Sequence, residues 1–177
     1  MRTTSSREAY RNPWIRIRED VLELDDGSPG LYGVLERDDF AVVIPAERDS
    51  LWLVEQFRYP LGRRSWEFPQ GTWGHGDGGS AADLARTELA EETGLRADDL
   101  RLLGHLDADS GLSTQGFDVW LATGLTAGPT AREATEAGMT QALVPEAEVR
   151  RMIRAGEITD AATLAAFTLL LLDRNPA

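Results

Sequence analysis

The N-terminal part of the chain alternates between apolar and polar residues, a pattern typical of half-buried β-strands. Residues 14–24 (WIRIREDVLEL) alternate in this way, the run breaks at 25–30 (DDGSPG), and residues 31–37 resume an extended pattern. We therefore predict a β-hairpin in this region. Two further strands are expected at 40–44 and 51–54, on either side of a polar turn.

Shorter extended segments follow. Residues 66–68 (WEF) predict a short strand that ends at Pro69, and the glycine-rich stretch 71–79 indicates a loop. The remaining expected strands are 100–106, 117–122 and 142–144.

A helix is expected directly after the glycine-rich stretch. Ser80 can act as its N-cap, Asp83 lies at the capping-box position, and Gly94 stands where a C′ glycine ends a helix. The buried side of this helix would carry Leu84, Ala85 and Leu89.

Two more helices are expected later in the chain. Pro145 opens the first, which runs to about Ala155 and stops at Gly156, and Thr159 or Asp160 caps the second. The core face of the second helix would carry Leu164, Phe167, Leu170 and Leu171. Many strands with one early and two late helices predict an α/β fold, in which a mixed sheet packs between helices.

Composition narrows the chemistry. The 177 residues include no cysteine, which excludes disulfides, thiolate zinc sites and a cysteine nucleophile. The net charge of −12 argues against binding to a nucleic acid backbone, which calls for basic patches. No apolar run approaches the roughly 20 residues that span a bilayer, and the first residues do not form a secretory signal. We expect no membrane association and a cytoplasmic location.

Three carboxylates crowd the end of the first expected helix. Glu88, Glu91 and Glu92 share one helical face, where like charges repel by roughly 0.2–0.5 kcal/mol per pair. The last turn of a helix also disfavours anions. One interpretation is a solvated acidic face, which is the common fate of charge runs. The other is a site for a divalent cation, because Mg²⁺ prefers oxygen ligands and sits between carboxylates and substrate phosphates.

The stretch from Gly71 to Leu95 resembles the Nudix box, G-x5-E-x7-R-E-U-x-E-E-x-G-U, where U is apolar. The matches in its second half are Glu88, Leu89, Glu91, Glu92, Gly94 and Leu95. Its first half departs from the pattern. The loop carries two extra residues, Gly79 stands in place of the first glutamate and Thr87 in place of the arginine. Arg86 lies one position early and would point about 100° away.

The resemblance extends beyond the box to the ADP-ribose pyrophosphatase branch of the Nudix hydrolases. Residues 53–71 (LVEQFRYPLGRRSWEFPQG) and 154–172 (RAGEITDAATLAAFTLLLL) are similar to two segments of that branch. The resemblance implies a Nudix-type α/β/α sandwich at 40–177. It also implies an N-terminal antiparallel β segment at 1–39 that serves dimerisation and base binding, and hence a homodimer.

The resemblance assigns the metal site and the catalytic groups. Glu88, Glu91, Glu92 and the carbonyl of Gln70 would bind Mg²⁺, with Mn²⁺ as a substitute. Glu91 and Glu92 would also take part in catalysis. The general base would be Glu136, or Glu133 as the second candidate, although either could equally be a solvent-facing loop residue.

It also assigns the substrate site. Arg58 would hold a substrate phosphate, unless it forms a structural salt bridge. Glu67 would support the site, with binding of the metal through the loop as the alternative. Trp14 and Tyr32 would stack on the base, although core packing is an equal alternative for Tyr32. His75 is expected to be a polar loop residue with a substrate contact as the minority alternative. His105 is expected to be structural.

These assignments lead to a function. We expect Mg²⁺-dependent hydrolysis of a nucleoside diphosphate sugar, with ADP-ribose giving AMP and ribose 5-phosphate as the first candidate reaction. The branch usually carries Ser-Pro-Gly after the box, whereas this chain has Asp109-Ser110-Gly111. One alternative is a Nudix-fold nucleotide-binding or regulatory protein with little or no turnover. A metal-free enzyme with two carboxylates is a third, which three acids on one helix suit poorly.

Overall fold

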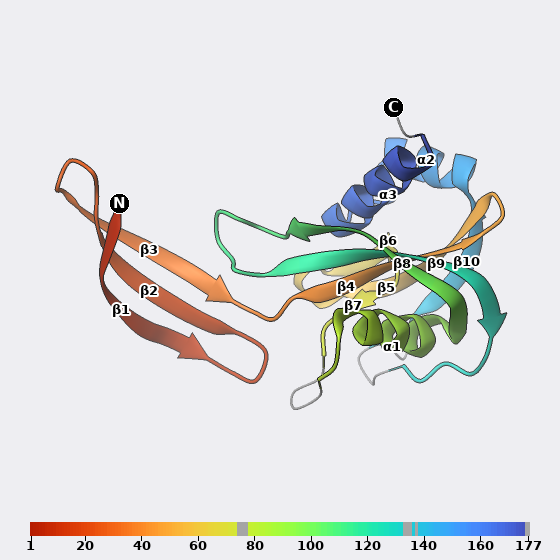
Figure 1. Ribbon diagram of the computed structural model, residues 1–177, viewed down its shortest axis with the longest axis horizontal. Coiled ribbons are helices and arrows are strands. Elements are labelled where there is room, and N and C mark those ends of the chain that lie inside the picture. The colour runs from red at the N-terminus through yellow and green to blue at the C-terminus, as the bar shows by residue number, and fades with distance from the viewer. Residues whose placement is uncertain (74–77, 133–135, 137, 176–177) are drawn as a thin grey trace.

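The computed structural model describes residues 1–73, 78–132, 136 and 138–175. Its N-terminal part is an antiparallel sheet of three strands in the order β1-β2-β3. These strands are β1 (Arg2–Arg11), β2 (Arg16–Glu23) and β3 (Pro29–Glu36). The sheet extends away from the rest of the molecule (Figure 1). The predicted hairpin is thus confirmed as β2 and β3.

The second sheet is mixed. In the described residues it has seven strands: β4 (Phe40–Glu47), β5 (Ser50–Arg58), β6 (Arg63–Glu67), β7 (Gln70–Gly71), β8 (Leu95–Asp107), β9 (Gly116–Ala127) and β10 (Thr140–Pro145). The main path runs β10-β5-β4-β9-β8, while β6 pairs with β5 and β7 pairs with β4. The β4–β9 pair is parallel and the other pairs are antiparallel.

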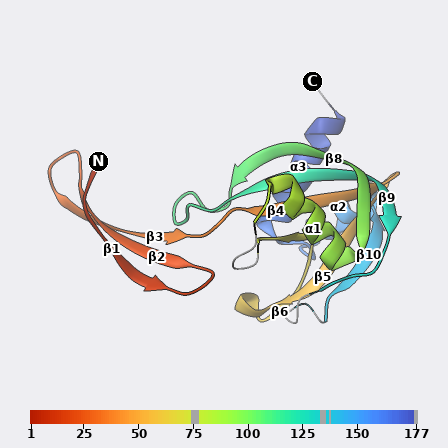
Figure 2. The same cartoon turned by 60° about the horizontal axis from the view of Figure 1, so that its bottom comes forward.

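Helices cover both faces of this sheet. Helix α1 (Ala81–Thr93) packs on one face, and α2 (Glu146–Arg154) and α3 (Ala161–Arg174) lie on the other (Figures 1 and 2). The central strand β4 serves both layers, because successive side chains of a strand point to opposite faces. Val42 and Ile44 belong to the core below α2 and α3, whereas Ala41 and Val43 belong to the core below α1. The predicted α/β sandwich is confirmed.

Local signals set the ends of α1. The Ser80 side chain accepts a hydrogen bond from the amide of Asp83, and the Asp83 carboxylate accepts one from the amide of Ser80, so the predicted capping box is present. Gly94 ends the helix with φ of 72°. A Cβ atom there would lie 2.4 Å from the carbonyl oxygen of Gly128. Both the positive φ and this close approach therefore require glycine at position 94.

The sequence pattern missed one strand and misjudged the extent of another. Strand β1 lacks a buried residue, so it carries no apolar alternation that could reveal it. Strand β8 begins at Leu95, directly after α1, and not near residue 100. A 3₁₀ turn at Tyr59–Leu61 was also not predicted.

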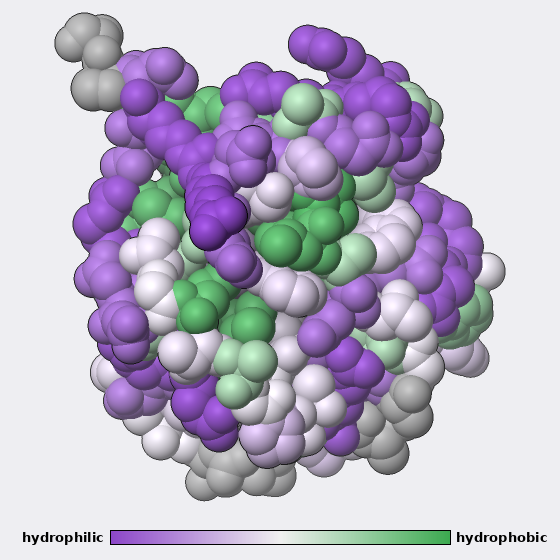
Figure 3. Space-filling model, turned by 90° about the vertical axis from the view of Figure 1, so that its right-hand side faces the viewer, coloured by the Kyte–Doolittle hydropathy of each residue, from purple (hydrophilic) through white to green (hydrophobic). Residues whose placement is uncertain are grey.

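The helices and one face of the surface bear on the expectation that the protein does not associate with a membrane. Among the described residues, the structure holds no helix of the length and apolarity that a membrane crossing requires. At the end of the molecule opposite the N-terminal sheet, small apolar areas are separated by hydrophilic residues (Figure 3).

Candidate active site

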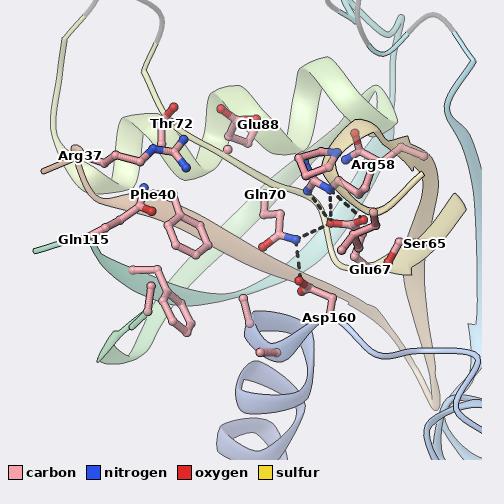
Figure 4. Close-up of a pocket in the computed structure, with 18 of the residues that line it drawn as sticks. Arg37, Phe40, Arg58, Ser65, Glu67, Gln70, Thr72, Glu88, Gln115 and Asp160 are labelled. Atoms are coloured by element: carbon pink, nitrogen blue, oxygen red, sulfur yellow. Dashed lines mark hydrogen bonds and ion pairs between the residues drawn. The ribbon is translucent and has the colours of Figure 1, made fainter. Parts of the chain in front are cut away.

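A cavity of about 1140 Å³ lies between the start of α3, the middle of α1 and the connection from the N-terminal sheet. Most of the residues that the sequence marked as functional line it: Trp14, Arg58, Glu67, Gln70, Glu88, Glu91 and Glu136. Figure 4 shows side chains from several elements pointing into this space. Glu92 is buried and does not line the cavity. Tyr32 does not line the cavity of its own chain either.

Glu88 lies against the backbone at Gly71. Its side chain is buried, and a Cβ atom at residue 71 would meet the Glu88 carboxylate oxygens at 2.5 and 2.6 Å. Strand β7 holds Gly71 in place by pairing it with Ala41 of β4. The glycine therefore makes room for a carboxylate that would otherwise have to move.

Glu92 is almost fully buried, with 1% of its surface exposed. Its Oε2 accepts a hydrogen bond from the backbone amide of Gln70 at 3.1 Å, and its Oε1 is buried with no hydrogen-bond partner in the described residues. Burial, then the negative charges of Glu88 and Glu136, raise the pKa of Glu92 well above its ordinary range. A buried carboxylate with an unsatisfied oxygen is costly unless a cation or a proton compensates it.

The side chain of Gln70 connects three parts of the site. Its Nε2 donates to Glu67 and, at 3.2 Å, to Asp160 Oδ2 (Figure 4). Asp160 is the N-cap of α3 and accepts a hydrogen bond from the amide of Thr163 at 2.8 Å. The loop that presents Gln70 is thus tied to the start of α3.

Arg58 forms an ion pair with Glu67. Nε of Arg58 lies 3.1 Å from both carboxylate oxygens, and Glu67 is 1% exposed. Burial alone would lower the pKa of Arg58, but the hydrogen bond and charge of Glu67 outweigh it, and the pKa is raised. The salt-bridge alternative for Arg58 is therefore what the structure contains, in a side chain that also lines the cavity.

Glu91 and Glu136 face the same cavity from different elements. Glu91 is half-buried on α1, and Glu136 lies in the connection between β9 and β10. After burial and the charge of Glu88, the negative charge of Glu136 is a further cause of the raised pKa of Glu92. Glu133 and His75 lie outside the residues that the structure describes.

The two aromatic residues predicted to bind the base are placed differently. Trp14, in the connection between β1 and β2, lines the cavity and is 68% exposed. Tyr32 on β3 donates a hydrogen bond from its hydroxyl to the carbonyl oxygen of Gly111 at 2.6 Å. In its own chain Tyr32 therefore joins the N-terminal sheet to the loop at 109–111.

Comparison with known proteins identifies the relatives of this chain. Residues 1–35 match the model of the nucleoside diphosphate sugar hydrolase N-terminal domain, and residues 35–167 match the model of the NUDIX domain. An ADP-ribose pyrophosphatase of Mycobacterium tuberculosis (strain ATCC 25618 / H37Rv) is 32% identical over 165 residues, which are 92% of this chain and 79% of the relative. The chain belongs to the Nudix hydrolase family.

A solved structure supports the Nudix fold over almost the whole chain. The crystal structure of an ADP compounds hydrolase superposes with a TM-score of 0.84, at 19% sequence identity, covering 98% of this chain and 95% of the other. The match spans both sheets, so the N-terminal sheet is part of the shared architecture.

The structure shows the surroundings of the two positions that depart from the Nudix box. A Cβ atom at Gly79 would lie 2.9 Å from the Trp73 ring, so an aromatic side chain occupies the space beside the position where the box has glutamate. Thr87 lines the cavity in place of the box arginine. Arg86 donates to the carbonyl of Ala97 at 3.2 Å and points away from the site, as its position on the helix predicted.

Nudix hydrolases generally use divalent metal ions, and the residues here fit such an ion. Within the described part of the chain, no three histidine or acidic side chains are grouped closely enough to hold a metal by themselves. Mg²⁺ does not require such a group, because one or two carboxylates, waters and substrate phosphates complete its shell. The unsatisfied Oε1 of Glu92 is the atom that most directly calls for a cation.

Three residues of the site were not recognised from the sequence. Asp160 was assigned only as a helix cap, although its second role is to bind Gln70. Trp73 gave no functional signal beyond its place in the loop. Arg37, which lines the cavity from the connection between β3 and β4, belongs to no motif.

Proposed function

We propose that this Nudix hydrolase cleaves the diphosphate of ADP-ribose or a closely related nucleoside diphosphate sugar in the cytoplasm, with Mg²⁺ as its cofactor. With ADP-ribose and one water molecule, the products are AMP and ribose 5-phosphate. The family membership supports the class of reaction. Support for the substrate comes from the similar pyrophosphatase, whose name specifies ADP-ribose.

The observation that carries the proposal is the Glu92 carboxylate. One of its oxygens is buried without a hydrogen-bond partner in the described residues, and the negative charge of the neighbouring Glu88 adds to the cost. Glu88, Glu91, Glu92 and the carbonyl of Gln70 would supply oxygen ligands, and waters and the substrate phosphates would complete the shell of the ion. When bound, Mg²⁺ neutralises charge on the diphosphate and lowers the pKa of a water molecule.

Other cavity residues accept the proton of the water and bind the diphosphate and the base. Glu136 accepts the proton of the attacking water, for which its place on the cavity wall beside the carboxylates of α1 is suitable. Arg58 holds Glu67 in place and presents its remaining N–H groups to the diphosphate. Trp14 stacks on the base, since aromatic stacking is worth about 1–3 kcal/mol per base in nucleic-acid binders.

We also propose that two copies pair through the N-terminal sheet, which spans most of the segment 1–39. Tyr10 lies opposite Ile17, and Leu31 lies opposite Val21, so these four side chains share one face. Tyr10, Val21 and Leu31 are 52%, 39% and 66% exposed, and a second copy would cover them. In such a homodimer Tyr32 could reach the base from the partner subunit. Light scattering on the wild type and on Leu31→Glu tests the dimer.

The reaction is tested with a substrate panel. ADP-ribose, UDP-glucose, GDP-mannose and a dinucleoside polyphosphate are incubated with Mg²⁺, Mn²⁺ or EDTA, and the released monophosphate is quantified. We expect metal-dependent AMP release, fastest from ADP-ribose. Binding of ADP-ribose with no turnover would support the regulatory alternative, and cleavage that resists EDTA would overturn the metal assignment.

A further inference from the structure

The connection between β9 and β10 contains Glu136, and its first part runs along α1 (Figure 1). Two backbone hydrogen bonds hold that part at the end of the helix. The amide of Gly128 donates to the carbonyl of Gly94 at 2.7 Å, and the amide of Ala131 donates to the carbonyl of Glu91 at 3.1 Å. The chain that leads to Glu136 is therefore fixed to the helix that carries the other acidic residues of the site.

The side chain of Arg132 adds a further contact at the same helix end. Its Nε donates to the carbonyl of Glu92 at 2.9 Å. Carbonyl groups in the last turn of a helix have no partner within the helix, and the helix dipole favours a cation there. Arg132 therefore stabilises the turn in which Glu91 and Glu92 place two carboxylates, at the end that disfavours anions.

The same guanidinium joins the two ends of the segment that contains Glu136. Its Nη1 donates to the carbonyl of Met139 at 2.6 Å, and its Nη2 donates to Oε1 of Gln141 at 3.3 Å. The amide of Met139, a buried residue, donates in turn to the carbonyl of Glu136 at 2.8 Å. Arg132 thus connects the end of α1 to the backbone of Glu136 through a continuous series of hydrogen bonds.

The chemistry of arginine suits this position. Each nitrogen of the Arg132 guanidinium donates to a different acceptor, and the acceptors are neutral oxygens on three separate residues. A guanidinium spreads its donors over a planar fork, whereas the ammonium of lysine has all its donors on one atom. Lysine would therefore keep the positive charge at the end of α1 but could not make the same set of contacts.

A second arginine holds the far end of the segment to the sheet. Arg64 of β6 donates from its Nη2 to the carbonyl of Gly138 at 3.1 Å and to the carbonyl of Glu55 at 2.8 Å. Its Nε also donates to the Glu55 carboxylate at 2.8 Å. Arg64 thus attaches the segment to β5 and β6, whereas Arg132 attaches it to α1. Loss of Arg132 would leave the attachment to the sheet and release one attachment to the helix.

We propose that Arg132 is a positioning residue, which holds Glu136 at the separation from the carboxylates of α1 that proton transfer from the attacking water requires. The assignment rests on the proposed function, because it takes Glu136 as the general base. Arg132 is not among the described residues that line the cavity, so it acts through Glu136 and not by contact with the substrate. Displacement of a catalytic group by about 1 Å can lower a rate about a hundredfold.

The test compares Arg132→Gln, which removes the charge, with Arg132→Lys, which keeps it. Arg86→Gln is the matched control, because Arg86 also donates to a backbone carbonyl, that of Ala97, but points away from the site. The kcat and KM for ADP-ribose are measured for each variant. The two Arg132 substitutions are also combined with Glu136→Gln. Calorimetry with Mg²⁺ and AMP reports metal affinity, and thermal unfolding verifies that each variant is folded.

Arg132→Gln should lower kcat about tenfold to a hundredfold and leave KM and metal affinity unchanged. Arg132→Lys should recover part of the loss, and Arg86→Gln should match the wild type. In the Glu136→Gln background, the substitution of Arg132 should have little further effect, because the group that it positions is already absent. A residue that only supports the fold would lower kcat by the same factor in both backgrounds.

Such an equal loss in both backgrounds, an unchanged kcat in Arg132→Gln, or weaker metal binding in that variant would overturn the assignment while the proposed function stands. Full turnover in Glu136→Gln would overturn it as well, together with the choice of general base. A wild type that does not cleave ADP-ribose would overturn the proposed function itself. If Arg132→Gln does not fold, Arg132→Lys provides the same comparison between the two backgrounds.

Discussion

The backbone amide of Gln70 donates a hydrogen bond to Oε2 of Glu92 at 3.1 Å, and in the described residues the other oxygen of that carboxylate is buried without a partner. The loop before α1 thus holds the carboxylate in one orientation and leaves one oxygen unsatisfied. Such an arrangement lowers stability on its own and is explained when the oxygen is a ligand.

Glu92→Gln separates function from stability. The amide keeps the shape of the side chain and removes the buried charge, so thermal unfolding should occur at the same or a higher temperature. Turnover should fall by at least about a hundredfold, because even the outer partners of metal ligands cost 10–100-fold. Glu148→Gln, the same change on the surface of α2, is the control and should keep full activity.

A fall in activity with an equal fall in stability would contradict this prediction. It would show that Glu92 supports the fold only, and the same kinetic and unfolding measurements on both variants distinguish the two cases.

Gly71→Ala should displace the Glu88 carboxylate. The added methyl group would lie 2.5–2.6 Å from its oxygens, well inside contact distance. We expect weaker Mg²⁺ activation, measured as a higher metal concentration at half-maximal rate. Gly78→Ala is the matched control, since a Cβ atom there meets nothing within 4 Å. Equal metal dependence in the two variants would contradict the prediction.

Trp73 should anchor the loop that precedes α1. Its ring lies against Gly79 and packs beside the core under α1. Trp73→Ala should therefore increase the rate of proteolytic cleavage in the loop and lower kcat. Restoring the glutamate with Gly79→Glu should destabilise the protein, because the Cβ atom alone lies 2.9 Å from the ring. An unchanged unfolding temperature in Gly79→Glu would argue against this packing.

His105 should make the free energy of unfolding depend on pH. Its Nδ1 lies 2.9 Å from Asp118 Oδ1, and this hydrogen bond raises the pKa of His105 above its ordinary value of 6.5. The stabilisation is therefore complete below pH 6.5 and is lost as the pH rises through the raised pKa. Because the side chain is half exposed, the effect on stability should be small.

Proton NMR of the imidazole checks this. The pKa of His105 should fall toward its ordinary value in Asp118→Asn, with His75→Asn used to assign the signals. A pKa that is the same in both proteins would show that Asp118 does not act on the histidine.

The sequence predicted those features that depend on residues close together along the chain. The capping box of Ser80 and Asp83, the terminating Gly94 and the carboxylates of α1 all follow from short spacings, and the structure contains each of them. Strand β1 could not be found in this way, since none of its residues is buried and it therefore shows no apolar alternation, although it pairs with the next strand, β2.

Contacts between distant segments were equally out of reach. No short motif predicts that the Trp73 ring lies beside Gly79. Gln70 and Asp160 lie 90 positions apart, and their hydrogen bond follows from the packing of α3 against the loop.

The central claim is that the buried carboxylates of α1 bind a divalent cation. Calorimetric titration of the metal-free protein with Mg²⁺ and Mn²⁺, repeated with AMP present and with Glu92→Gln, tests it most directly. We predict saturable binding to the wild type that becomes tighter with AMP and is lost in Glu92→Gln. No heat of binding from either metal, with or without the nucleotide, would contradict the account.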